Sequence, residues 1–211
     1  MNPFLSYIDI MIHLDKKLAL VIAEYGFLTY LILFLIIFSE TGLVFLPFLP
    51  GDSLLFVAGT LAAFGSLNVA ILISILSIAA ILGDTVNYHI GKFSGKKMLH
   101  KYPNILKQEY IDRTNEFYNK HGGKTIVIAR FIPIVRTFAP FAAGIGHMDY
   151  KQFLLYNVFG GIFWVSFFIL SGYFFGNIPF VKDNFSIFIL IIIVLSAIPV
   201  IIEFLKHKKK K

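Results

Sequence analysis

The stretch PFLPGDS at positions 47–53 interrupts an apolar segment that runs over residues 27–64. Its two prolines and one glycine cannot continue a helix, because proline lacks an N–H and clashes with the preceding turn. A second apolar segment, 125–148, is interrupted in the same way by Pro133 and Pro140. Broken helices at membrane depth are tolerated only where protein buries the open backbone or where it lines a wet cavity. The two segments therefore predict two re-entrant helical hairpins, and paired breaks of this kind are typical of a transporter's substrate site.

The composition identifies the class of protein. Of the 211 residues, 57% are hydrophobic and 15% are charged, whereas a soluble domain carries roughly 25% charged residues. A soluble protein of this size cannot bury so much apolar surface. The sequence therefore predicts an all-α integral membrane protein, a single membrane domain over 1–211, and it excludes soluble enzymes. Because the chain has no cysteine, disulfides, thiolate nucleophiles and cysteine-ligated metals are excluded too, and we expect no cofactor and no metal.

Long charge-free runs locate the crossings. A membrane helix needs about 20 consecutive apolar residues, and three runs are long enough. They predict transmembrane helices at 68–91, 152–175 and 184–205.

The distribution of basic residues orients the chain in the membrane. Cytoplasmic loops are enriched in Lys and Arg, so the basic segment 92–124 and the Lys-rich tail 206–211 are both expected in the cytoplasm. The first hairpin then enters from outside, the second enters from the cytoplasm, and residues 1–26 form a surface helix outside. The net charge of +7 lies mainly in the two cytoplasmic segments, which favours a topology signal over a nucleic-acid surface.

An internal repeat relates the two halves of the chain. Sliding the sequence along itself by 81 positions gives an ordered match that needs one short gap. Each half then holds a proline-interrupted hairpin and one long crossing, at 27–95 and 125–176, so the sequence predicts an inverted repeat. The matches include Gly91 on Gly172, Gly95 on Gly176 and, across the gap, Ala58-Gly59 on Ala143-Gly144.

Five charged residues lie at membrane depth in this arrangement. Each costs about 2.5–3.5 kcal/mol on insertion scales if it is unpaired. Arginine suits the recognition of phosphate in a low-dielectric site, which makes Arg130 and Arg136 candidate phosphate ligands. A buried carboxylate can bind and release a proton during transport, which makes Glu40 and Asp52 candidate proton-coupling groups. Asp84 is the fifth. We expect the two acids of the first hairpin, Glu40 and Asp52, to face the two guanidinium groups across a cavity.

Several of these residues have plainer alternative roles, which the sequence leaves open. Asp52 can cap the half-helix that follows it, and Arg130 can extend to the cytoplasmic interface. Asp84 and Tyr88 share a helix face and can make ordinary interhelical hydrogen bonds, as can Asn157. We keep these last three as secondary site residues.

At these positions the sequence resembles the DedA family of bacterial inner-membrane proteins, whose VTT-type domain is shared with eukaryotic lipid scramblases. The resemblance implies two re-entrant hairpins in an inverted repeat, translocation of membrane lipids including undecaprenyl phosphate, and a link to the proton-motive force. The family's essential acidic pair and arginine pair fall on Glu40, Asp52, Arg130 and Arg136. The motifs that carry the resemblance are Glu40-Thr-Gly42, Phe48-Leu-Pro-Gly-Asp-Ser53, Gly83-Asp84, Tyr88, Gly91, Phe117–Gly123, Arg130-Phe-Ile-Pro-Ile-Val-Arg136, Pro140, Ala143-Gly144, Met148, Phe153, Asn157, Gly160 and Trp164.

Two functions from different classes compete. The leading one is a proton-coupled transporter that moves an anionic lipid phosphate across the bacterial inner (cytoplasmic) membrane, with lipid and protons as its partners. The alternative is a proton-coupled antiporter of small ions or cationic drugs, which uses the acids as its site and the arginines as counter-charges. A lipid phosphatase, and with it an enzyme, is disfavoured because the six histidines are scattered. A homo-oligomer is left open.

Overall fold

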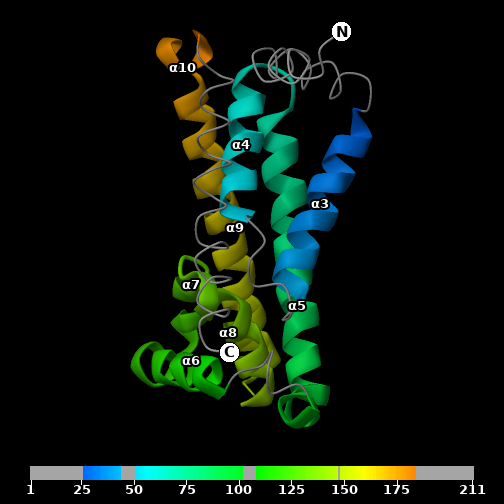
Figure 1. The fold of residues 1–211 in the computed structure, drawn as a ribbon, viewed down its shortest axis with the longest axis vertical. Coiled ribbons are helices and arrows are strands. Elements are labelled where there is room, and N and C mark those ends of the chain that lie inside the picture. Colours follow the sequence, from blue (N-terminus) through cyan, green and yellow to red (C-terminus); the bar gives the residue numbers. More distant parts are fainter. Residues whose placement is uncertain (1–25, 44–50, 102–107, 147, 184–211) are drawn as a thin grey trace, which may run out of the picture. The chain divides into compact units, whose positions relative to one another are not determined.

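The computed structural model describes residues 26–43, 51–101, 108–146 and 148–183. These residues form helices joined by short turns, and no strand occurs among them (Figure 1). The described chain divides into two compact units, one drawn from residues 1–32, 50–72 and 167–211 and the other from 33–49 and 73–166. The predicted helical class is therefore confirmed for the described residues.

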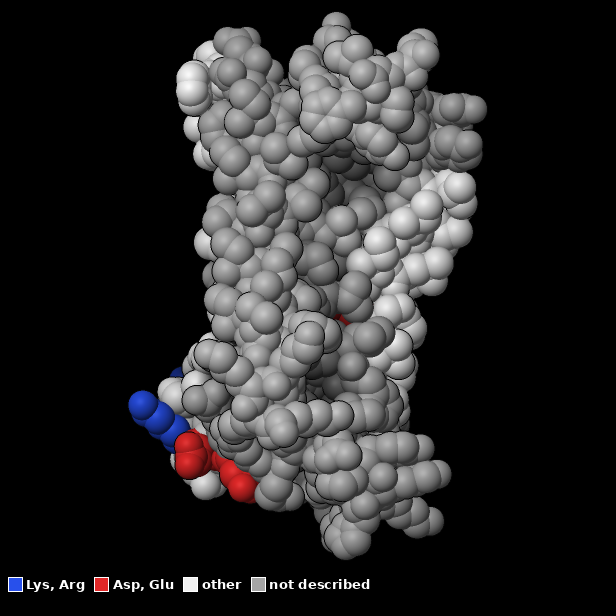
Figure 2. Space-filling model, viewed as in Figure 1, with Lys and Arg blue, Asp and Glu red and all other residues white. Residues whose placement is uncertain are grey.

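The first apolar segment, 27–64, contains the helices α3 (Phe27–Gly42) and α4 (Gly51–Ala63). Between them lie residues 44–50, which contain Pro47 and Pro50 and are outside the described residues. The described surface over α3 is almost entirely uncharged in Figure 2, with a single small red patch at its inner edge. Such a surface suits a hydrocarbon environment, since an exposed charge there would be costly.

Helix α5 (Val69–Lys101) begins at a well-formed cap. The Asn68 side-chain oxygen accepts hydrogen bonds from the backbone N–H groups of Ala70 and Ile71, at 2.9 and 3.1 Å. The preceding turn contains Gly65 at φ +77°, a conformation that only glycine adopts without strain. Helix α5 thus starts one residue after the predicted crossing and continues about three turns beyond its predicted end.

Helix α9 (Tyr150–Gly176) is the second long helix, and α10 (Pro179–Asp183) follows it. Its first turn is capped by Asp149, whose carboxylate accepts the N–H of Lys151 at 2.9 Å. The stretches Val69–Gly95 and Tyr150–Gly176 are both long and apolar enough to cross a membrane. They correspond to two of the three predicted crossings. The predicted helix at 184–205, the tail 206–211 and nearly all of the surface helix 1–26 lie outside the described residues.

In the unit built from α4 and the end of α9, glycines set the packing distance. A Cβ atom on Gly172 would lie 2.0 Å from the carbonyl oxygen of Phe56, and one on Gly59 would lie 2.1 Å from that of Ile169. Thr60 adds a hydrogen bond of 3.2 Å from its hydroxyl to the carbonyl of Gly172. Only glycine permits such close backbone approach, which is how membrane helices associate when both surfaces are apolar.

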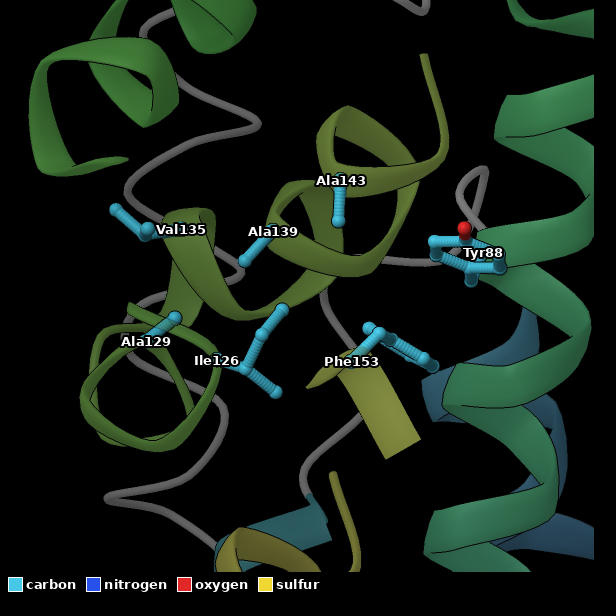
Figure 3. Packing of buried hydrophobic residues seen from close by; sticks show 7 residues of the cluster. All are labelled: Tyr88, Ile126, Ala129, Val135, Ala139, Ala143 and Phe153. Carbon is cyan, nitrogen blue, oxygen red and sulfur yellow. The ribbon is translucent and has the colours of Figure 1, made fainter. Parts of the chain in front are cut away.

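The other unit contains α6 (Gln108–His121), η1 (Gly122–Lys124), α7 (Thr125–Ala129) and α8 (Pro133–Ile145), packed with parts of α3, α5 and α9. The charged side chains visible in Figure 2 gather over α6. A buried apolar cluster joins α5, α7, α8 and α9 in this unit (Figure 3). Within it the rings of Tyr88 and Phe153 stack at 4.4 Å between centroids.

The contacts of α8 with α5 recur between α4 and α9 at fixed sequence spacings. A Cβ atom on Gly91 would lie 2.2 Å from the carbonyl oxygen of Phe141, the counterpart of the contact at Gly172 and Phe56. The spacings are 81 residues along the long helices (91 to 172) and 85 along the short ones (56 to 141). The equivalent contacts are Gly91–Phe141 with Gly172–Phe56, Tyr88–Gly144 with Ile169–Gly59, and Gly95–Ile145 with Gly176–Thr60.

Candidate functional site

A buried ion pair joins α3 to α8. The Arg136 Nη2 donates to the Glu40 Oε1 at 2.6 Å, and the side chains are 7% and 2% exposed. Glu40 lies in the last turn of α3, where the negative end of the helix dipole disfavours a carboxylate. The positive charge of Arg136 therefore stabilises the Glu40 carboxylate at this position. Arg136 stands in the first turn of α8, after Pro133 has started the helix.

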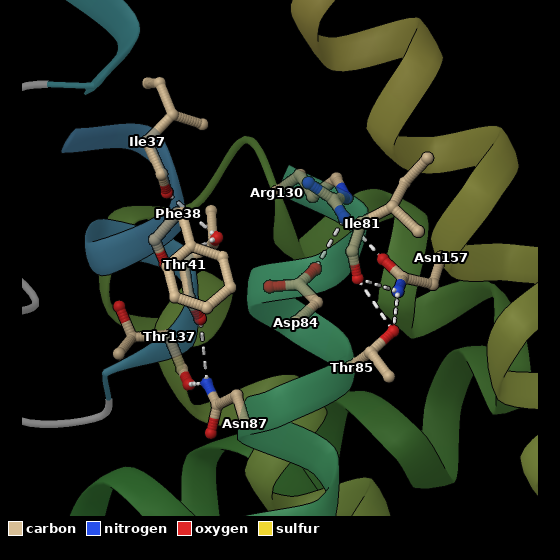
Figure 4. Close-up of polar contacts among 10 residues, drawn as sticks. All are labelled: Ile37, Phe38, Thr41, Ile81, Asp84, Thr85, Asn87, Arg130, Thr137 and Asn157. Carbon is tan, nitrogen blue, oxygen red and sulfur yellow. Dashed lines mark hydrogen bonds and ion pairs between the residues drawn. The ribbon is translucent and has the colours of Figure 1, made fainter. Parts of the chain in front are cut away.

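A second buried pair joins α5 to the turn between α7 and α8. The Arg130 Nη2 donates to the Asp84 Oδ2 at 2.5 Å and to the Asn157 Oδ1 at 2.6 Å (Figure 4). Arg130 and Asp84 are 2% and 3% exposed, and Asn157 is fully buried. The Asn157 Nδ2 in turn donates to the Ile81 carbonyl at 3.0 Å, which fixes the amide on α5. Arg130 thus bridges a carboxylate on one long helix and an amide on the other.

Close helix contacts made possible by glycine bring these groups together. A Cβ atom on Gly42 would lie 3.3 Å from the Gly83 Cα, so α3 and α5 nearly touch next to Glu40 and Asp84. On α9, a Cβ atom on Gly160 would lie 3.2 Å from the Arg130 Nε. The arginine side chain therefore crosses α9 where that helix has no side chain of its own.

Trp164 lies against both guanidinium groups. Its ring centroid is 5.9 Å from the Arg130 Cζ and 5.3 Å from the Arg136 Cζ, and the side chain is fully buried. A tryptophan face attracts cations, more strongly when they are shielded from water. Because both arginines approach one ring, Trp164 connects the two ion pairs.

Hydrogen bonds around the pairs fix the surrounding backbone. The Asn87 Nδ2 donates to the carbonyl oxygens of Thr41 at 3.2 Å and Thr137 at 2.9 Å, which joins α5 to α3 and α8 (Figure 4). The Tyr118 hydroxyl on α6 donates to the Ala139 carbonyl at 3.0 Å. Burial, together with the negative charge of Asp84, raises the pKa of Tyr118, so the phenol stays protonated and can serve as this donor.

Arg130 retains unused hydrogen-bonding capacity. Its Nε and Nη1 atoms are buried and have no hydrogen-bond partner among the described residues. A guanidinium group carries five N–H donors, and only those on Nη2 are engaged by Asp84 and Asn157. Buried donors without acceptors are costly, so this arginine is suited to an additional acceptor such as an anion.

Each of the two described ion pairs is neutral. Glu40 and Asp84 supply two negative charges, and Arg130 and Arg136 supply two positive ones. The four groups together are neutral when all are ionised. Among the described residues, no group of three or more His, Asp or Glu side chains is arranged to hold a metal ion.

Four of the five predicted buried charges lie in one compact unit and form two ion pairs, Glu40–Arg136 and Asp84–Arg130. Arg130 is buried beside Asp84, so its predicted alternative role of extending to the interface is wrong. The carboxylate opposite Arg130 is the secondary candidate Asp84, and Asn157 joins them. Asp52 belongs to the other compact unit, where it lies half-buried in the first turn of α4, which begins at Gly51. An acid at that place complements the helix dipole from within the helix.

Tyr88 has a structural role. Its hydroxyl donates to the Met148 carbonyl at 2.5 Å, and its ring belongs to the apolar cluster of Figure 3. The sequence identified Trp164 only among the residues of the family resemblance and did not predict its contact with both arginines. A signal was present, since Asn157, Gly160 and Trp164 recur every three to four residues and so share one face of α9.

Comparisons with known proteins identify relatives of this chain. A family model described as the VTT domain matches residues 49–174. The chain is 55% identical to Protein DedA of Escherichia coli (strain K12) over 206 residues, which cover 96% of this chain and 94% of that protein. It is also similar to the inner membrane protein YqjA of the same strain, with 36% identity over 71% of this chain and 69% of that one. An uncharacterized membrane protein of Mycobacterium leprae is 42% identical over 79% of this chain and 75% of its own length. No solved structure matches the chain.

Proposed function

Because the chain belongs to the DedA family of membrane proteins and carries a VTT domain, we propose that it transports an anionic lipid phosphate across the bacterial inner membrane in exchange for, or together with, protons. Undecaprenyl phosphate and phospholipids are the substrates considered. The relative YqjA is named an inner membrane protein, which supports this location.

The observation that carries the proposal is the pair of buried arginines with buried carboxylate partners in an apolar helical unit. A structural role alone is a weak reason to bury four charges, because apolar residues of similar volume are often as stable or more stable. Arginine recognises phosphate by charge-assisted hydrogen bonds, and the carboxylates can exchange protons when their partners leave. We assign phosphate binding to Arg130 and Arg136, and proton coupling to Glu40 and Asp52.

We further propose that the architecture is an inverted repeat of two re-entrant hairpins with three transmembrane helices and a cytoplasmic C-terminus. The recurrence of the α5–α8 contacts between α9 and α4, at spacings of 81 and 85 residues, supports the repeat. In transporters built from such repeats, the substrate site lies where discontinuous helices meet near the midplane.

The proposal is tested by reconstituting the full chain in proteoliposomes and measuring movement of labelled undecaprenyl phosphate, with a labelled phosphatidylglycerol in parallel. We expect translocation of at least one of these lipids, abolished in Arg136→Ala and altered in its pH dependence in Glu40→Gln. Protein-free liposomes and a variant of an exposed acid, Asp149→Asn, serve as controls. Absence of lipid movement under an imposed proton gradient in either direction contradicts the proposal.

One observation favours the alternative, a proton-coupled antiporter of small ions or cationic drugs. Both arginines are already neutralised by carboxylates, as expected if the arginines only serve as counter-charges for acids that bind protons and cations. In the same proteoliposomes, movement of protons or cations without movement of lipid identifies this function.

A further inference from the structure

We propose that Asp84 is the group that takes up a proton when Arg130 receives a lipid phosphate, an inference that rests on the proposed function of the site. Asp84 then acts as an exchangeable counter-ion that controls when Arg130 is available. This assigns to the Asp84–Arg130–Asn157 unit a role distinct from that of the pair formed by Glu40 and Arg136.

Asp84 and Arg130 form a neutral buried pair. Their two charges sum to zero, and both side chains are at most 4% exposed. A phosphate that enters adds at least one negative charge to an apolar environment. An uncompensated buried charge is strongly unfavourable, so binding must be accompanied by a gain of positive charge. A proton on a buried carboxylate provides this gain of positive charge.

The hydrogen bonding of Arg130 identifies which carboxylate is concerned. Its Nε and Nη1 are buried without partners in the described structure, whereas its Nη2 is held by Asp84 and Asn157. An incoming phosphate oxygen therefore finds donors on Arg130 while the Asp84 carboxylate is still 2.5 Å from the same group. Two anions on one guanidinium repel each other, and Asp84 is the one that can be neutralised by a proton.

The exchange forms one O–H bond and breaks no bond between heavy atoms of the protein. A hydronium ion from the aqueous phase gives its proton to the Asp84 carboxylate and leaves as water, so the contact of Asp84 with Arg130 loses the attraction between opposite charges. The phosphate then replaces the carboxylate as the counter-ion of Arg130. The neutral acid can donate its O–H to a phosphate oxygen. When the phosphate departs, the proton leaves Asp84 and the original pair reforms. Asn157 keeps the guanidinium in place throughout, since its amide is bonded to Ile81 on α5.

The other charged and titratable groups around Asp84 do not offer the same exchange. Arg136 on α8 also acts on Asp84 electrostatically, but it is paired with Glu40 of α3. Tyr118 on α6 is protonated and donates to a backbone carbonyl. Among the described residues, Arg130, Arg136 and Tyr118 are the titratable groups that interact electrostatically with Asp84.

The experiment measures binding of labelled farnesyl phosphate, a short isoprenoid monophosphate, to the full chain in detergent by equilibrium dialysis at several pH values. Farnesol serves as the neutral ligand control. The variants are Asp84→Asn, which mimics the neutral acid, Asp84→Glu, which keeps a titratable carboxylate, and Asp149→Asn, which alters an exposed acid of the same unit. Helix content by circular dichroism verifies that each variant is folded, and Asp84→Glu provides the titratable comparison if Asp84→Asn is unstable.

Phosphate monoesters themselves titrate near neutral pH, which changes the Kd of every variant in the same way. The Kd of each protein is therefore divided by the Kd of Asp84→Asn at the same pH. We expect this ratio to rise with pH for the wild type, by up to about tenfold per pH unit for one coupled proton, and also for Asp84→Glu and Asp149→Asn. A flat ratio with phosphate binding intact overturns the role of Asp84 alone. Absence of farnesyl phosphate binding by every protein at every pH overturns the proposed function together with this inference.

Discussion

Glu40 and Arg136 are 96 positions apart in the sequence but 2.6 Å apart in the structure. The sequence predicted that both residues lie at membrane depth, where an unpaired charge is costly. It predicted phosphate binding for Arg136 and proton coupling for Glu40. The sequence did not predict that Asp84 is the partner of Arg130. The position of Asp84 beside the site depends on the close approach of α3 and α5 at Gly42 and Gly83. Glycines are frequent in membrane helices, so the sequence does not reveal which of them mark a crossing.

Removing one member of the Glu40–Arg136 pair should be more harmful than removing both charges. Arg136→Gln leaves a buried carboxylate without its arginine, a change that costs about 3–5 kcal/mol of stability. We expect the double variant Glu40→Gln/Arg136→Gln to be more stable than Arg136→Gln in thermal unfolding of the detergent-solubilised protein. Equal or lower stability of the double variant contradicts the idea that this pair is coupled.

Trp164 should stabilise the site through its π face as well as its volume. Each cation–π contact contributes about 0.5–2 kcal/mol depending on burial, and two arginines lie over this ring. Trp164→Leu should therefore lower thermal stability more than Trp164→Phe does. Phe174→Leu on the same helix, where the ring is 68% exposed, is the matched control and should have little effect. If both Trp164 variants behave alike, packing volume alone accounts for the residue.

At the level of elements, the sequence located the helices but misplaced some of their ends. The hairpin segments 27–64 and 125–148 each contain two described helices. In the second segment Pro133 starts α8 as predicted, but the predicted interruption at Pro140 is wrong, because Pro140 lies inside α8. Helix α5 continues to Lys101 because basic residues mark a membrane edge without ending a helix.

The glycines at the helix contacts give a prediction for each unit. Gly172→Ala places a methyl group 2.0 Å from a backbone carbonyl oxygen, and Gly91→Ala places one at 2.2 Å. Overpacking of this kind costs about 1–3 kcal/mol or more. We expect both variants to unfold at a clearly lower temperature. Gly161→Ala is the control, because its methyl group would meet the Ile81 side chain at 2.9 Å, and a side chain can move aside.

For the whole molecule, the sequence contains the glycine spacing on which the proposed repeat rests, because glycines lie at equivalent helix contacts in both units. The partners of the helices could not be found in this way. Each short helix packs on the long helix of the other half of the sequence, α4 on α9 and α8 on α5. The spacings of 81 and 85 residues show which residues of the two halves are equivalent. They do not show which helix surfaces contact each other.

The proposed topology gives a prediction that uses the absence of cysteine from the chain. Single cysteines introduced by Asn119→Cys on α6 and Asn177→Cys after α9 both replace exposed residues. A membrane-impermeant maleimide added to intact cells should label only the cysteine at 177, and both after the cells are permeabilised. Labelling of the cysteine at 119 in intact cells reverses the proposed orientation.

The central claim is that the buried arginine–carboxylate pairs carry a lipid phosphate across the membrane. The most direct measurement compares translocation of labelled undecaprenyl phosphate in proteoliposomes by the wild type and by Asp84→Asn/Arg130→Gln, a double variant that keeps the site neutral. Helix content and thermal unfolding confirm that this variant is folded. The account predicts transport by the wild type and none by the folded double variant. Transport by the double variant at the wild-type rate contradicts it.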